Sequence, residues 1–117
     1  MIDLSARWVP SQQEFDDFAA VSGDDNQIHV DPEFSARTTF GRTVSHGMLI
    51  YAKLWGMVLR HNPDCRQIHQ SLMFPNPCFA GEEITLSVRG MTPGSLTLTA
   101  SRSADGAVVL NGEARIA

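Results

Sequence analysis

The 117-residue sequence predicts an α+β domain in which one antiparallel sheet curls around one long helix. Three observations predict this fold class. One segment in the middle of the chain is apolar around almost its whole circumference when it is wound as a helix. The segments after Pro63 alternate apolar and polar residues with a period of two, and turn-forming pairs separate them. At this length we expect a single domain over residues 1–117, with a core large enough to fold without disulfides or a metal.

The apolar segment reads "HGMLIYAKLWGMVLRHNP", from His46 to Pro63. Lys53 is the only charge within its apolar run, so a helix here must be surrounded by protein. Arg60 and His61 suit the negative C-terminal end of this helix, and the Asn62-Pro63 pair ends it.

The strands are expected mainly in the second half of the chain, in the runs "RQIHQSLMF", "EITLSVRG", "SLTLTASRS" and "AVVLNGEARI". Pro93-Gly94 and Asp105-Gly106 lie at the junctions and predict hairpin turns. We therefore expect an antiparallel meander with one apolar and one polar face. Four or five strands cannot cover every side of the central helix. Pairing with a second copy, edge to edge or face to face, is therefore expected, which gives a homodimer or a higher even oligomer.

The first half of the chain is expected to be mainly helical, after a short strand in "ARWV" at residues 6–9. In "PSQQEFDDFAAVSG", Ser11 and Glu14 have the spacing of a capping box, and Gly23 is placed to end the helix in the left-handed conformation. A polar loop follows. The segment "DPEFSARTTFG" then predicts a short helix that Asp31 caps and Gly41 breaks.

Composition excludes several classes of protein. A net charge of −4 and a pI near 5.4 argue against a nucleic-acid-binding protein, which usually has a basic face. No apolar run is long enough for a signal peptide or a membrane span. Cys65 and Cys78 form no CxxC pair and are expected to be buried thiols in a reducing compartment. We expect a soluble, cytoplasmic protein that binds neither nucleic acid nor membrane.

The polar loop "SGDDNQIHVDPEFSA" contains the first candidate site. Asp24 and His29 could form an acid/base pair, because a carboxylate can orient an imidazole or hold a water with it. Loop composition alone favours a simpler interpretation, an Asx-turn beside a packed histidine. A metal site at His29, Asp31, Glu33 or His46 is disfavoured, because the EF-hand, HExxH and paired-cysteine spacings are all missing. We therefore expect no metal.

The second candidate site is "SHGM", from Ser45 to Met48, at the start of the central helix. The first-turn amides of a helix have no intrahelical partners, and the helix dipole makes that end positive. Gly47 lets a substrate carbonyl approach the backbone, and a thioester oxygen bound there would be polarised toward an enolate. From these residues alone, the favoured explanation is that Gly47 only permits close packing and that His46 caps or packs.

The two segments together resemble a known family. "FAAVSGDDNQIH", then "DPEFSA" and "GRTVSHGML", are similar to the MaoC-like, or (R)-specific enoyl-CoA hydratase, group of the hot-dog fold. The resemblance covers Phe15 to Tyr51 closely. The residues that match the family motif are Phe18, Ser22, Gly23, Asp24, Asn26, Ile28, His29 and the Ser35-Ala36 pair.

This resemblance implies reversible hydration of a trans-2-enoyl thioester, carried by CoA or acyl carrier protein, to an (R)-3-hydroxyacyl thioester without a cofactor. It implies that Asp24 and His29 hold the catalytic water. Gly47, Asn26 and His46 are implied as oxyanion and substrate-binding residues, with the Gly47 amide on the thioester carbonyl and Asn26 orienting the loop or the histidine. Gln27 replaces the proline of the family motif, and the chain is short for the family, which puts the length of the acyl group in doubt.

Two other functions stay open at this point: a hot-dog acyl-CoA thioesterase, and a non-catalytic subunit that binds acyl thioesters. The Asp-x-Asn-x-x-His loop before the central helix favours the hydratase over the thioesterase. The intact Asp24 and His29 argue against a non-catalytic subunit.

Overall fold

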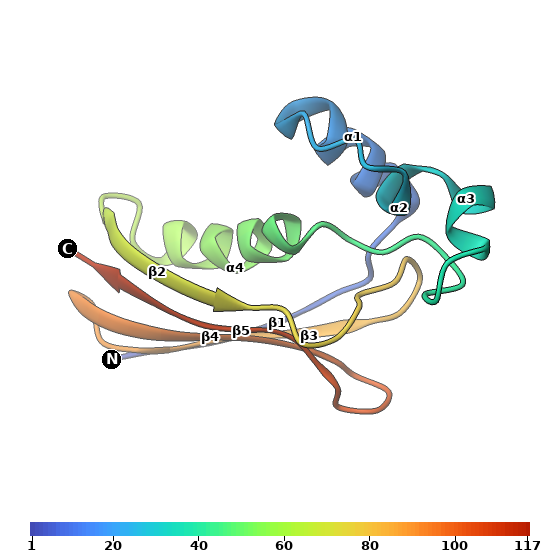
Figure 1. Cartoon of the computed structure of the whole chain (residues 1–117). Coiled ribbons are helices and arrows are strands. Elements are labelled where there is room, and N and C mark those ends of the chain that lie inside the picture. The colour runs from blue at the N-terminus through green and yellow to red at the C-terminus, as the bar shows by residue number, and fades with distance from the viewer.

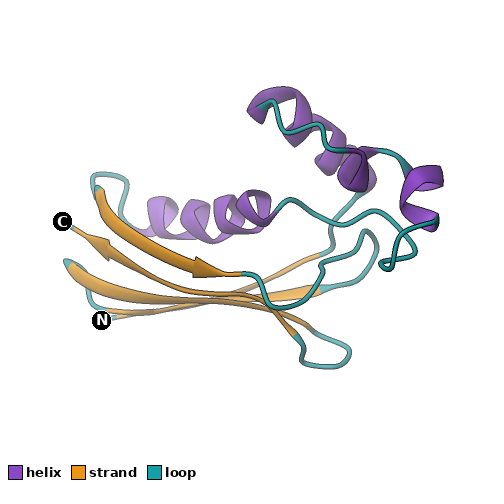
Figure 2. Cartoon of the chain, in the orientation of Figure 1, coloured by secondary structure: helices purple, strands orange, loops and turns teal.

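The computed structural model describes residues 1–117. Its elements, in chain order, are β1 (Ile2–Trp8), α1 (Gln12–Ser22), α2 (Gln27–Val30), α3 (Pro32–Ala36), α4 (Gly47–His61), β2 (Gln67–Met73), β3 (Ile84–Gly90), β4 (Gly94–Arg102) and β5 (Val108–Ile116). Figures 1 and 2 show α4 lying along one face of the sheet, while α1, α2 and α3 gather beyond the N-terminal end of α4. The predicted α+β class, with a curled antiparallel sheet and one long helix, is confirmed.

The sheet is antiparallel throughout, with the strand order β1-β3-β4-β5-β2. The hairpins β3–β4 and β4–β5 form at the two predicted turns. The expected meander is wrong for β2, which pairs with β5 at the far edge, while β1 takes the place beside β3. The connection over residues 74–83 contains two prolines and no tight-turn pair, so it cannot close a β2–β3 hairpin.

The core lies between α4 and the sheet. The helix buries one side, which consists of Leu49, Ile50, Tyr51, Leu54, Met57 and Val58. Its other side is not covered by this chain: Ala52 is exposed, and Met48 and Leu59 are 45% and 37% exposed. The expectation that protein surrounds the helix is therefore met on one side only. None of the helices combines the length and the apolar character needed to cross a membrane.

The N-terminal elements begin and end largely where local chemistry predicts. At α1, the Ser11 hydroxyl accepts the Glu14 backbone N–H, the Glu14 carboxylate accepts the Ser11 backbone N–H, and Gly23 ends the helix at φ 81°. The first strand is longer than predicted and spans Ile2–Trp8, because each of its residues pairs with a residue of β3. Val9, expected in the strand, lies outside it and is exposed.

Two short helices follow α1, where one was expected. Asn26 starts α2 by accepting the Ile28 backbone N–H at 3.1 Å, in a stretch predicted as loop. Asp31 caps α3 as predicted, by accepting the Phe34 backbone N–H. This helix ends at Ala36, well before Gly41, and the following turn closes through tighter bonds, in which the Arg37 and Thr38 backbone N–H groups donate to the carbonyls three residues before them.

Candidate active site

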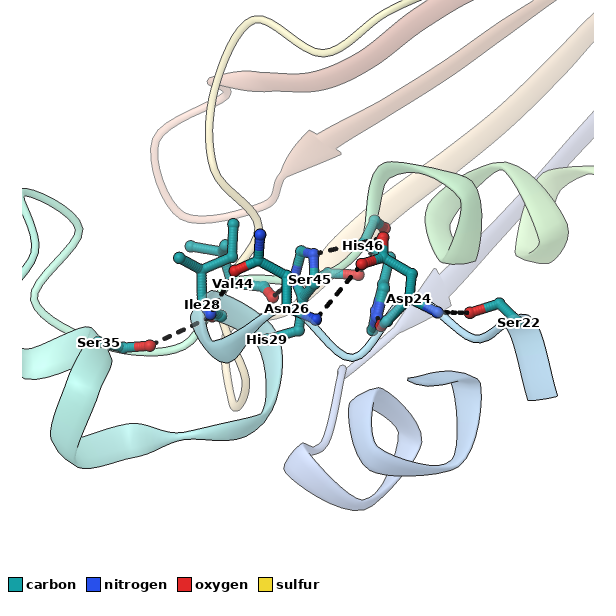
Figure 3. Close-up of polar contacts among 9 residues, drawn as sticks. All are labelled: Ser22, Asp24, Asn26, Ile28, His29, Ser35, Val44, Ser45 and His46. Atoms are coloured by element: carbon teal, nitrogen blue, oxygen red, sulfur yellow. Dashed lines mark hydrogen bonds and ion pairs between the residues drawn. The ribbon is translucent and has the colours of Figure 1, made fainter. Parts of the chain in front are cut away.

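The first turn of α2 brings Asp24 and His29 together (Figure 3). Asp24 lies in the loop after α1, and His29 lies on the buried side of α2. The His29 Nε2 and Asp24 Oδ2 atoms are 3.7 Å apart, and the two side chains are 10% and 55% exposed, respectively. One group is therefore held inside the protein while its partner reaches solvent.

The orientation of the His29 ring determines which nitrogen faces Asp24. Its Nδ1 lies 2.8 Å from the Val44 carbonyl oxygen, which can only accept, so Nδ1 carries the proton and donates it. The Nε2 lone pair therefore faces the Asp24 carboxylate. The Gln12 side chain holds the same turn from the other side by donating to the His29 carbonyl at 2.8 Å.

This geometry fits a water molecule between the two groups. The 3.7 Å separation is too long for a direct hydrogen bond, and both facing atoms are acceptors. A water about 2.8 Å from each atom can donate one O–H to Nε2 and the other to the carboxylate. Its oxygen then keeps a lone pair free for attack, and both neighbours can accept a proton.

His46 lies against both groups from the start of α4. Its Nε2 donates to the Asp24 backbone carbonyl at 2.8 Å, and its ring stacks on the His29 ring with 3.8 Å between centroids. The residue is 2% exposed. Burial lowers its pKa below the usual value, and the charge that His29 carries when protonated lowers it further. The hydrogen bond to Asp24 acts in the opposite direction.

Gly47 begins α4, and no side chain caps this helix. Its backbone N–H is one of the first-turn amides that lack an intrahelical partner. A Cβ at this position would lie 2.7 Å from the Phe74 ring, so the glycine is required by close packing. Close packing was the explanation for Gly47 that its residue type alone favoured. Its free backbone N–H is a second property of the same position.

A cleft of about 390 Å³ opens beside these groups. Asp24, His46 and Gly47 all line it, and its apolar wall includes Val44, Ile50, Phe74, Cys78 and Val109. Burial raises the pKa of the Cys78 thiol to about 12, so this side chain is a neutral part of the wall. The cleft therefore offers a polar end at Asp24 and an apolar interior.

His29 does not line this cleft itself, but its Nε2 faces Asp24, which does. Asn26 also lies outside the cleft. Its side-chain oxygen is engaged in capping α2, which shapes the turn between Asp24 and His29. The sequence-predicted residues thus fall into two groups, one that faces the cleft and one that supports the loop behind it. Sequence reasoning missed Gln12 and the Val44 carbonyl, because their contacts with His29 join segments 17 and 15 residues away and leave no local signal.

A metal ion fits this cluster less well than a water does. Ligand atoms of Asp24, His29 and His46 lie within 4.8 Å of one another. However, the two imidazole rings are stacked at an interplanar angle of 24°, so their in-plane lone pairs do not converge on one point. One nitrogen of each ring also donates to a backbone carbonyl.

Comparison with known proteins places the chain among related sequences. The family model for the MaoC like domain matches residues 3–101. The (R)-specific enoyl-CoA hydratase of Aeromonas caviae is 38% identical over 104 residues, which are 83% of this chain and 78% of that protein. The mitochondrial 3-hydroxyacyl-[acyl-carrier-protein] dehydratase of Arabidopsis thaliana is 34% identical over 65% of this chain and 46% of its own length.

Solved structures show the same fold. The (R)-hydratase from A. caviae superposes with a TM-score of 0.88 at 31% identity, over 98% of this chain and 92% of that chain. An R-hydratase from Pseudomonas aeruginosa gives a TM-score of 0.87 at 25% identity, over 98% of this chain and 78% of that one. The hot-dog fold is thereby confirmed. From its family-model match and its similarity to the A. caviae hydratase, the chain belongs to the MaoC-like domain family.

Proposed function

We propose that the protein catalyses the reversible addition of water to a trans-2-enoyl thioester, which gives an (R)-3-hydroxyacyl thioester. The observation that carries the proposal is the 3.7 Å separation of the Asp24 carboxylate and His29 Nε2, with Asp24 on the same cleft as Gly47. The names of the two relatives, a hydratase and a dehydratase of acyl thioesters, support the same reaction in its two directions.

In the hydration direction, the water between Asp24 and His29 attacks C3 of the enoyl group. One of its protons passes to the pair as the new C–O bond forms, the electron pair of the double bond moves toward the thioester carbonyl, and C2 then takes up a proton from the pair. The product has gained a hydroxyl at C3 and a hydrogen at C2, and the pair returns to its starting state. Both groups face the same water, so the proton transfers are assigned to the pair and not to one residue.

The negative charge that develops on the thioester oxygen needs a stabilising group. The Gly47 N–H serves this role, because it starts an uncapped helix whose dipole is positive at this end. His46 forms the adjoining wall of the cleft, and Asn26 keeps the Asp24–His29 turn in shape. The apolar interior suits the acyl chain of a CoA or carrier-protein thioester, and the reaction requires no cofactor or metal.

Pairing of two copies into a homodimer, or into a higher even oligomer, is part of the proposal. The outer side of α4 exposes Met48 and Leu59, and the edge strand β2 exposes Ile68 and Met73 at 58% and 65%. A second copy would cover these side chains. Light scattering of the purified protein measures the mass of the assembly and so tests the pairing. A cytoplasmic location stays a prediction, supported by two cysteines that are both free and buried.

The decisive experiment mixes the purified protein with crotonyl-CoA and follows the absorbance of the enoyl thioester. We expect this absorbance to fall, and we expect Asp24→Asn and His29→Ala each to slow the reaction by at least about 10²-fold, because acid/base catalysis is lost. Asp25→Asn and His61→Ala are the matched controls, since both residues are exposed and lie outside the site. Near-normal turnover in either site variant would rule out the mechanism.

The same reaction mixture distinguishes the other two functions. A thioesterase would release free CoA, which a thiol reagent detects, without requiring loss of the double bond. A non-catalytic subunit would do neither, although it could still bind the thioester. Loss of the enoyl absorbance with no thiol release is the result that the hydratase requires.

A further inference from the structure

His46 contacts both members of the proposed catalytic pair (Figure 3). Its Nε2–H donates to the Asp24 carbonyl at 2.8 Å, and its ring stacks on His29 at 3.8 Å with an interplanar angle of 24°. The Phe18 ring packs against it at 4.9 Å and 59°. Because His46 immediately precedes Gly47 in the chain, this one side chain connects the acid/base pair to the start of α4.

These contacts differ from those expected of a helix cap or a simple packing residue. His46 occupies the N-cap position of α4, yet its side chain makes no capping hydrogen bond. The ring is almost fully buried, and its Nδ1 has no hydrogen-bond partner. Burying an unpartnered polar atom lowers stability, so an apolar side chain would serve packing better at this position.

We propose that His46 is a positioning residue for the hydration reaction: it ties the Asp24 backbone to the start of α4 and supports the ring of His29. It thereby fixes the acid/base pair relative to the Gly47 amide. The inference rests on the proposed function, because it concerns where the water lies relative to the bound thioester.

The connectivity of the chain makes such a tie necessary. Asp24 lies in the loop after α1, whereas Gly47 belongs to α4, and the two are 23 residues apart in the sequence. The His29 turn is tied to Val44 by the Nδ1 hydrogen bond and by the Val44 N–H to the Ile28 carbonyl at 3.0 Å. The Asp24 carbonyl is held separately, by the hydrogen bond that it accepts from His46. A shift of about 1 Å between a catalytic group and a bound substrate can cost about 10²-fold in rate.

The protonation state of His46 suits this role. Since Nε2 donates to a carbonyl, the neutral ring carries its lone pair on Nδ1. The positive end of α4 disfavours a charge on the ring, and burial lowers its pKa in the same direction. The titratable groups that face it are Asp24 and His29. A neutral His46 lets His29 accept a proton from water without a like charge stacked upon it.

Two substitutions separate the hydrogen bond from the ring. His46→Phe keeps an aromatic ring against His29 but removes the donor to Asp24, whereas His46→Gln removes the ring but keeps an N–H donor. With crotonyl-CoA, we expect the phenylalanine variant to lose about 10- to 10²-fold in kcat with KM within about threefold, because Gly47 and the apolar wall of the cleft are unchanged and the new side chain keeps an aromatic ring in the place of His46. We expect the glutamine variant to recover most of this loss.

The matched controls are His61→Phe and His61→Gln at the exposed C-terminal end of the same helix, which should leave both constants unchanged. If the phenylalanine variant does not fold, His46→Leu provides the donor-free side chain. A rise in KM with kcat unchanged would assign His46 to substrate binding and overturn the proposal. Equal losses of kcat in the glutamine and phenylalanine variants would overturn it as well.

Amide hydrogen exchange tests the tie without any substrate. We expect faster exchange over residues 23–29 in His46→Phe and near-normal exchange in His46→Gln. Unchanged exchange in both variants would overturn the positioning role. Failure of the proposed function is a separate result, in which the unsubstituted protein does not hydrate crotonyl-CoA while this loop still responds to His46→Phe.

Discussion

The sheet with α4 and the arm formed by α1, α2 and α3 differ in what holds them in place. Between α4 and the sheet lies a cluster of 18 buried apolar residues. The arm buries few large side chains, chiefly Phe15 of α1, and two of its buried residues, His29 and Ser35, are polar. Figure 1 shows the arm beyond the N-terminal end of α4 and set apart from the strands.

Polar contacts therefore set the position of the arm. Gln12 accepts a hydrogen bond from the Thr43 hydroxyl, Val44 pairs with the α2 turn through two hydrogen bonds, and Glu14 meets Lys53 of α4 at 2.6 Å. Hydrogen bonds are directional but contribute little net stability each. The core therefore determines whether the chain folds, whereas the arm determines whether Asp24 and His29 are correctly placed. Substitutions in the core should therefore mainly lower the free energy of unfolding, whereas substitutions in the arm should mainly lower turnover.

The largest effect on stability is expected from the core. Leu54 is fully buried at the centre of α4, and Leu54→Ala should lower the free energy of unfolding by about 2–5 kcal/mol. Turnover per folded molecule should stay within about threefold of normal, because Leu54 is not among the residues that line the cleft. Urea unfolding and steady-state kinetics measure the two quantities. A large loss of kcat in fully folded protein would show that the two regions are not separable.

A smaller loss of stability, but a larger loss of turnover, is expected from the arm. Gln12→Ala removes the donor to the His29 carbonyl and the partner of the Thr43 hydroxyl, which should cost about 1–2 kcal/mol. Turnover should fall more than in Leu54→Ala, since the His29 turn loses a support. Gln13→Ala is the matched control, because Gln13 binds only the exposed Asp17. Equal activities of the two glutamine variants would contradict the role of Gln12.

The smallest effect is a pH dependence that comes from His46, where the two regions meet. Its pKa is lowered in the folded protein by burial, whereas the unfolded chain has the ordinary histidine value of about 6.5. The unfolded state therefore takes up a proton first as the pH falls, so the free energy of unfolding should decline below about pH 6.5 and not above it. Urea titrations at several pH values measure this decline, which should be shallower in His46→Gln. If the free energy of unfolding falls equally steeply with pH in the unsubstituted protein and in His46→Gln, His46 is not the source of the decline.

The parts of the structure that are set by local chemistry were predictable from the sequence. The capping box of α1, the left-handed Gly23 and the continuous apolar run of α4 all depend on neighbouring residues, and each was found as predicted. The edge position of β2 was not predictable, because alternation identifies a strand but not its partner. Within the site, the motif predicted that Asp24 and His29 would be functional partners. The stacking of His46 on His29 depends on how α4 meets the arm, which no local pattern encodes.

The buried thiol of Cys78 has a chemical consequence for the proposed reaction with unsaturated acyl thioesters. Such thioesters are electrophiles at C3, and a thiolate beside them would add to the double bond and block the cleft. With a pKa of about 12, Cys78 ionises in only about one molecule in 10⁵ at neutral pH. The wall can therefore contain sulfur without being alkylated by its own substrate.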